Sequence, residues 1–85
     1  MKHRSRMEIT GLILEPAYCR GVRKTKIMNK AFLNHAQLQQ YLLMLTERDL
    51  IRYDGQTRTF KTAEKGLRFL KAYNEINQRM KEQEI

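Results

Sequence analysis

The 85-residue chain is the length of one small domain, and its 17 lysines and arginines against nine acidic residues give it a net charge of +8. Hydrophobic residues make up 41% of the chain, too many for a disordered basic tail. No apolar run approaches the ~20 residues of a membrane span, and no apolar signal segment follows the basic N-terminus. A single cysteine excludes an internal disulfide and a cysteine-rich zinc site. These features predict a soluble, intracellular domain whose surface attracts polyanions.

The positive charge is concentrated in two stretches of the chain. Residues 1–30 carry +6 and residues 51–66 carry +2, whereas the segment between them, residues 31–50, carries −1. With a pI near 10, two separate basic patches favour nucleic acid as the partner.

The first predicted helix begins near Arg6. Ser5 and Glu8 have the spacing of a capping box, and an amphipathic stripe follows at Ile9, Leu12 and Ile13. Pro16 removes one intrahelical hydrogen bond, so the helix should stop near Glu15 or continue for one kinked turn. Gly21 is suited to a left-handed cap that closes it.

Two further helices are predicted around a short connection. Residues 24–31 are compatible with a helix, and Phe32-Leu33-Asn34 then interrupts the period. Asn34 and Gln37 form a second capping box, which starts a helix over residues 34–48. Its apolar stripe is Leu38, Tyr41, Leu42 and Leu45. Two helices joined by three or four residues form a helix-turn-helix unit.

A hairpin and a long final helix complete the predicted order. Residues 50–53 and 58–61 are β-prone and flank the turn signal Asp54-Gly55. Thr62 is expected to N-cap a helix that runs to the low eighties. The predicted fold is therefore α+β and mostly α: a winged helix-turn-helix of three helices and a two-stranded wing, with a long C-terminal helix.

The sequence also resembles a known family, the small archaeal winged helix-turn-helix DNA-binding proteins that dimerise through a long C-terminal helix. The matching segments are RSRMEITGLILE, RKTKIM, LNHAQLQQYLLML, LIRYDGQ and KTAEKGLRFL. The resemblance covers nearly the whole chain. It implies a transcriptional regulator or a chromatin-associated protein, cytoplasmic and located at the nucleoid, with double-stranded DNA as its partner.

The resemblance places helix 34–48 in the major groove, with hairpin 50–61 as the wing. Helix-turn-helix proteins present the N-terminal half of this helix to base edges, where glutamine can bond adenine and alanine can meet a thymine methyl group. The candidate base-reading residues are Asn34, His35, Ala36, Gln37, Gln39 and Gln40.

Basic residues flank this nearly neutral helix on both sides in the sequence. Phosphate contacts of this kind dominate affinity and make it depend on salt, but they carry no sequence information. The candidates for phosphate and wing contacts are Arg4, Arg6, Arg23, Lys24, Lys26, Lys30, Arg52, Arg58 and Lys61.

The chain is expected to divide into a DNA-binding part, residues 1–66, and a dimerisation helix, residues 67–85. Ala63, Gly66, Leu67 and Leu70 can pack on the domain's own core. A coiled-coil seam for the dimer is expected along the same helix, at Phe69, Tyr73, Ile76 and Met80. The alternative is a terminal helix that folds back over its own domain.

Two other functions remain open from the sequence. Leu43 and Met44 occupy positions where the reading helix should be exposed, which suits a protein-interaction module that does not touch DNA. Structured RNA could use the same charges.

Catalysis is not expected, because Cys19, His3 and His35 share no metal-site spacing and the chain has no phosphate-binding glycine loop. Neither a metal, a cofactor nor a small-molecule substrate is therefore predicted.

Overall fold

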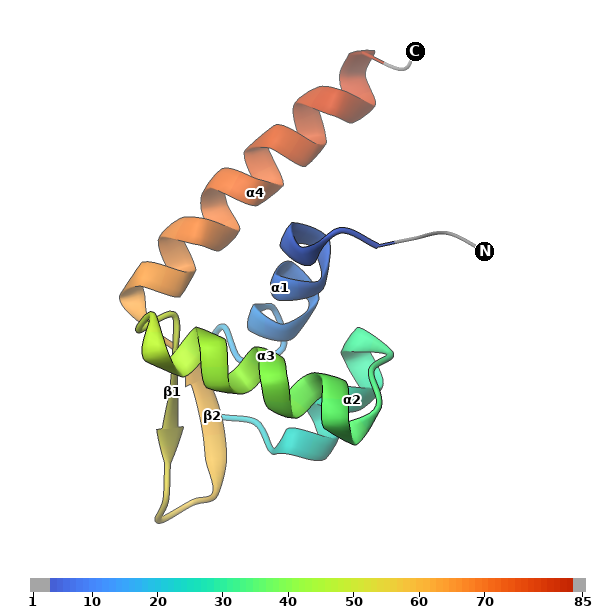
Figure 1. The fold of residues 1–85 in the computed structure, drawn as a ribbon. Coiled ribbons are helices and arrows are strands. Elements are labelled where there is room, and N and C mark those ends of the chain that lie inside the picture. The colour runs from blue at the N-terminus through green and yellow to red at the C-terminus, as the bar shows by residue number, and fades with distance from the viewer. Residues whose placement is uncertain (1–3, 84–85) are drawn as a thin grey trace.

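The computed structural model describes the backbone of residues 4–83 and the side chains up to Arg79. Within these residues, four helices and a two-stranded sheet follow one another in the predicted order (Figure 1). They are α1 (Arg6–Leu14), α2 (Lys24–Ala31), α3 (His35–Glu47), β1 (Ile51–Asp54), β2 (Thr59–Thr62) and α4 (Glu64–Gln83). The winged-helix architecture expected from the sequence is confirmed.

Local capping explains where α1 and α3 begin. The Ser5 hydroxyl accepts a hydrogen bond from the Glu8 amide at 3.0 Å. At α3, Asn34 accepts from the Gln37 amide at 2.8 Å, and the Gln37 side chain accepts from the Asn34 amide at 3.2 Å. This reciprocal pair satisfies two backbone donors that a helix start otherwise leaves unpaired.

The core lies between α1, α2, α3, β1 and the first half of α4. The predicted stripe of α3 is correct, since Leu38, Leu42 and Leu45 are all buried. In α1, Ile13 and Leu14 are fully buried, whereas Ile9 and Leu12 are only half-buried against the cluster. The inward face of α1 is therefore rotated relative to the predicted stripe.

The hairpin is tied to the segment that precedes α2. Strands β1 and β2 pair antiparallel, with Ile51 opposite Thr62. An isolated antiparallel bridge joins Val22 to this hairpin, because Val22 and Phe60 exchange backbone hydrogen bonds of 2.9 and 2.7 Å. This bridge holds the wing beside the N-terminus of α2.

Gly21 and Thr62 have structural roles different from those predicted. No glycine of the described chain has a positive φ, so Gly21 is not a left-handed cap. A Cβ at Gly21 would instead collide with the side chain of Thr59. Thr62 is the last residue of β2, and its hydroxyl donates to the Leu14 carbonyl at 2.7 Å rather than capping α4. Both errors arise from contacts between residues far apart in sequence.

Three residues other than glycine adopt the left-handed backbone conformation. Phe32, Asp49 and Arg58 have φ values of 55°, 60° and 56°. Phe32 ends α2 as its C-cap. Gly55 is not left-handed; the tip of the hairpin is shaped instead by the Asp54 carboxylate, which accepts from the Gln56 amide at 2.9 Å.

Helix α4 extends well beyond the rest of the domain, and the molecule including this helix measures 47 × 30 × 19 Å (Figure 1). Ala63, Gly66 and Leu70 lie buried on the core side. The helix continues without a break across residues 66 and 67, where the predicted functional division falls. No described helix is long and apolar enough to cross a membrane.

Candidate nucleic-acid interface

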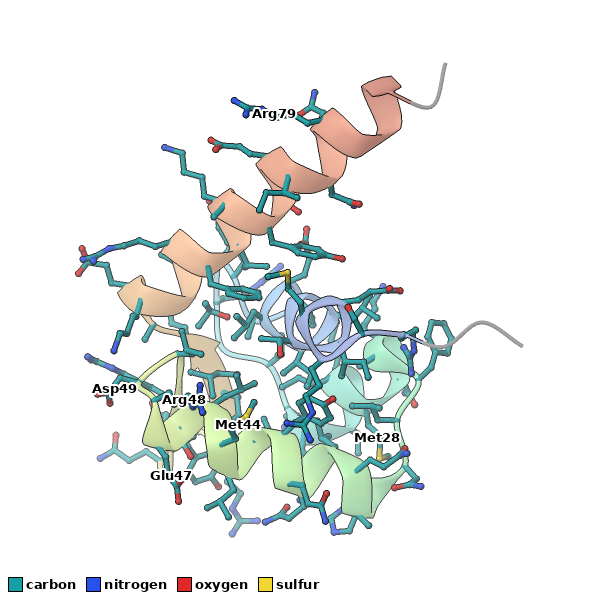
Figure 2. The ribbon with its side chains drawn as sticks, turned by 45° about the horizontal axis from the view of Figure 1, so that its top comes forward. Met28, Met44, Glu47, Arg48, Asp49 and Arg79 are labelled. Carbon is teal, nitrogen blue, oxygen red and sulfur yellow. The ribbon has the colours of Figure 1, made fainter. Side chains whose placement is uncertain are left out.

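The outward face of α3 is mostly polar and carries no lysine or arginine. All six candidate base-reading residues are exposed, and they occupy the N-cap and the first two turns of the helix. The same face continues through Leu43 to Glu47, whose side chain points away from the body of the domain, whereas Met44 lies on the side towards α1 (Figure 2). Buried Leu38, Leu42 and Leu45 hold this face outward by anchoring the opposite side of the helix.

A basic hollow of about 430 Å³ lies between the start of α2, α3 and the wing. Arg23, Lys24 and Arg58 line it, and the described residues around it include no carboxylate. Gln39 forms the α3 side of the hollow. The fold thus brings together four residues that the sequence analysis proposed separately for base and phosphate contacts.

Residues at the start of α2 that line this hollow also have unpaired backbone amides. Arg23 is the N-cap residue but makes no side-chain capping hydrogen bond. The amides of Lys24 and Thr25 have no hydrogen-bond partner among the described residues, and both residues line the hollow. Unpaired amides at a helix N-terminus carry partial positive charge and favour anions.

Lys24 contacts α3 directly, since its ammonium donates a hydrogen bond to the side-chain oxygen of Gln39. Gln39 is exposed and Lys24 is half-buried. The Gln39 oxygen is therefore occupied, and its NH₂ group remains as the donor end of the amide.

On the other side of α3, Arg6 lies beside two of the candidate glutamines. Arg6, Gln37 and Gln40 line a shallow hollow of about 350 Å³ together with Tyr41 and Met44. The oxygen of Gln37 is engaged in the capping box. Gln40 makes no hydrogen bond with the described residues, so both ends of its amide are available.

Arg4 has a structural role that the sequence did not suggest. Its guanidinium donates to the carbonyl oxygens of Ala31 and Phe32, the latter at 3.2 Å. These carbonyls end α2, where a cation also complements the helix dipole. Arg4 is half-buried and fixes the turn of the helix-turn-helix unit.

The remaining basic candidates lie on other surfaces. Arg52 and Lys61 are paired across the hairpin, and both line a hollow on the opposite face of the wing from Phe60 and Arg58. Lys26 lines a groove between α4 and the segment after α1, together with Glu15 and Glu64. Lys30 is exposed on α2.

Sequence reasoning missed the aromatic floor of the basic hollow. Tyr53 and Phe60 are cross-strand partners whose ring centroids lie 4.8 Å apart, and both line the hollow. Tyr53 remains 53% exposed, so an aromatic surface borders the cations. The register of the hairpin places these two residues opposite each other, and the pairing of the two strands could have revealed this aromatic pair.

The seam residues expected on α4 are divided between two environments. Phe69 packs on the core and stacks with Tyr73, with centroids 6.1 Å apart. Tyr73 also covers Gly11 of α1, where an added Cβ would lie 3.2 Å from the ring. Ile76 is 51% exposed, and the side chain of Met80 lies outside the described residues. Met7, one turn before Gly11 on α1, is an exposed apolar residue that the sequence analysis did not include.

The described residues hold no cluster of three or more His, Cys, Asp or Glu side chains that could bind a metal ion. His35 is exposed at the start of α3, and Cys19 is an exposed free thiol. His3 lies outside the described residues.

The helix-turn-helix followed by a bridged hairpin defines a winged-helix domain. A family model described as winged helix-turn-helix matches residues 3–81, almost the whole chain, and the protein belongs to this family. A search of curated proteins finds no match.

Proposed function

We propose that the protein binds double-stranded DNA, with α3 in the major groove and the β1–β2 hairpin as the wing. The observation that carries this proposal is the placement of cations on both sides of a reading face that has none. Arg23, Lys24 and Arg58 border α3 on the wing side, and Arg6 borders it on the other.

The dimensions of duplex DNA fit this arrangement. The major groove is about 12 Å wide and admits one helix, while phosphates line both of its edges. A helix in the groove needs neutral polar groups along the bases and cations towards the two backbones. The exposed face of α3 supplies the neutral polar groups, and the residues that flank it supply the cations.

The basic hollow is the strongest candidate for a phosphate contact. Three cations line a space without a described carboxylate, and two of its lining residues, Lys24 and Thr25, have unpaired backbone amides. Phosphate oxygens accept hydrogen bonds from both kinds of donor. Tyr53 can pack against the adjoining sugar, since it is half-exposed at the same edge.

We further propose that the protein acts as a homodimer through α4. Residues 1–66 then bind DNA, and residues 67–85 form the dimer contact, with Tyr73 and Ile76 at its described part. Dimeric helix-turn-helix proteins bind half-sites about one helical turn apart. Such a protein would act at the nucleoid in the cytoplasm as a transcriptional regulator or a chromatin component.

The protein-interaction alternative loses one of its two premises in the structure. It required Leu43 and Met44 as an exposed apolar pair, but Met44 is half-buried and packs against the core. Leu43 alone remains exposed on α3. A single apolar side chain offers far less surface area than the ~800 Å² that each partner buries in a stable protein interface.

The test is fluorescence anisotropy of a labelled DNA duplex titrated with the full-length protein at several salt concentrations. Four neutralised phosphates, one for each of Arg6, Arg23, Lys24 and Arg58, predict a log–log salt slope of about −3.6 per chain. Competition with an A-form RNA duplex separates the RNA alternative, because its deep, narrow groove excludes a helix. Absence of duplex DNA binding at low salt would refute the proposal.

A further inference from the structure

Leu43 stands out on the reading face of α3 because it is apolar and yet exposed. Its side chain is 61% exposed in the third turn of the helix. Helical spacing places it on the same face as Ala36 and Gln40, seven and three residues earlier. Its neighbour Met44 turns towards α1, so the exposure of Leu43 is not part of a larger apolar strip (Figure 2).

The surroundings of Leu43 are those of a nucleic-acid surface. The other large apolar side chains with high exposure in the described chain lie on other elements: Met7, Tyr18, Phe32, Tyr53 and Ile76. Around the α3 face, the basic hollow and Arg6 supply positive charge on both sides. An anionic molecule that also presents a small apolar group would complement both the flanking cations and Leu43.

Duplex DNA offers one apolar group in its major groove, the C5-methyl group of thymine. We propose that Leu43 contacts this methyl group and gives the protein a preference for A·T pairs. The inference rests on the proposed DNA binding and adds a base-reading residue to it.

Gln40 strengthens the same preference. Its amide is free at both ends, which is the requirement for bidentate pairing with the N6 and N7 of adenine. Side chains at positions i and i+3 are about 5–6 Å apart on a helix, and successive base pairs are about 3.4 Å apart. Gln40 and Leu43 can therefore read neighbouring base pairs.

The experiment compares two duplexes that differ only in the methyl group. One is an alternating dA·dT duplex, and the other has deoxyuridine in place of every thymidine. Affinities of the full-length protein are measured by anisotropy at one fixed salt concentration. The wild-type protein should bind the thymine duplex about fourfold more tightly, which corresponds to the burial of one methyl group.

Leu43→Ala should lower the preference for the thymine duplex, because the shortened side chain buries less of the methyl group. The exposed position of Leu43 allows the variant to fold normally, as circular dichroism can check. Glu47→Ala, one turn further along the same face, is the matched control and should keep the fourfold ratio. Equal wild-type affinity for the two duplexes, or an unchanged ratio in Leu43→Ala, would overturn the inference while leaving DNA binding intact. Failure to bind either duplex would refute the proposed function itself.

Discussion

The ammonium of Lys24, in the first turn of α2, donates a hydrogen bond to the side-chain oxygen of Gln39 on α3. This contact links the helix that should meet the phosphate backbone to the helix that should meet the bases. It also fixes the orientation of the Gln39 amide, because only the oxygen can accept from an ammonium group. Gln39 then offers its NH₂ group to the groove, and acceptors such as the N7 and O6 of guanine or the O4 of thymine are its complementary partners.

Replacing Lys24 should weaken DNA binding in a salt-dependent manner. We expect Lys24→Gln to make the log–log salt slope shallower by about 0.9, the contribution of one phosphate. Lys26→Gln removes the same charge from a neighbouring residue that lines the α4 groove instead. The pair should be compared by anisotropy across a salt series, and equal changes in slope would show that position on α2 does not matter.

Asn34 has two separable roles, as helix cap and as candidate base contact. Asn34→Asp keeps a capping oxygen and should leave the free energy of unfolding nearly unchanged, whereas Asn34→Ala should lower it by about 1 kcal/mol. The aspartate places a negative charge at the start of the reading helix, so it should weaken DNA binding. Urea denaturation and anisotropy measure the two effects. Full DNA affinity in Asn34→Asp would place residue 34 outside the interface.

Phe32 should be a site where glycine stabilises the protein. The residue is 80% exposed and has a φ of 55°, a conformation that costs an L-residue about 1 kcal/mol. Phe32→Gly should therefore raise the melting temperature by about 4–8 °C. Phe32→Ala removes the ring but keeps the Cβ, so it should produce little change. An equal rise in the two variants would assign the effect to the exposed ring instead of the backbone.

Gly66 should tolerate no side chain. A Cβ there would collide with the Leu50 carbonyl oxygen and with the Cγ2 of Thr62, where α4 leaves the sheet. Gly66→Ala is expected to lower the free energy of unfolding by about 3 kcal/mol. Gly55→Ala, at the hairpin tip, has only Tyr53 at 4.0 Å and should be nearly neutral. Thermal or urea denaturation of the two variants compares them directly, and equal stability would contradict the packing described at Gly66.

The dimer proposal predicts that Ile76→Glu separates the chains without unfolding them. Ile76 is half-exposed in the monomer, so a charge costs the fold little but is unfavourable in an apolar interface. Asn77→Glu, the next residue and also exposed, is the control. Sedimentation should show the association state lowered by the first change only. A wild-type monomer, or an unchanged state in Ile76→Glu, would contradict dimerisation through this part of α4.

The features that sequence reasoning found were those encoded by neighbouring residues. Ser5 with Glu8 and Asn34 with Gln37 fixed two helix starts, because a capping side chain and the amide it accepts from lie three residues apart. Asp54 marked the hairpin, although the φ values show that Gly55 does not supply the left-handed residue.

What the sequence did not reveal depends on contacts across the fold. Thr62 was expected to cap α4, but its hydroxyl is directed to Leu14, 48 residues away. Arg4 was proposed for a phosphate contact, and its hydrogen bonds to carbonyls at the end of α2, 27 and 28 residues away, were not foreseen. A basic or hydroxyl side chain has several possible partners, and only the packing of α1 against the rest of the domain decides between them.

Amide chemical-shift mapping of the ¹⁵N-labelled protein, titrated with a short DNA duplex, directly tests the placement of α3 in the major groove. We expect the largest shifts on the first half of α3 and on the basic hollow, at Lys24, Thr25, Gln39 and Arg58. Lys26 and the exposed outer face of α4 should shift little. Shifts concentrated along α4 or in the Lys26 groove, with α3 unaffected, would contradict the placement of α3 in the major groove.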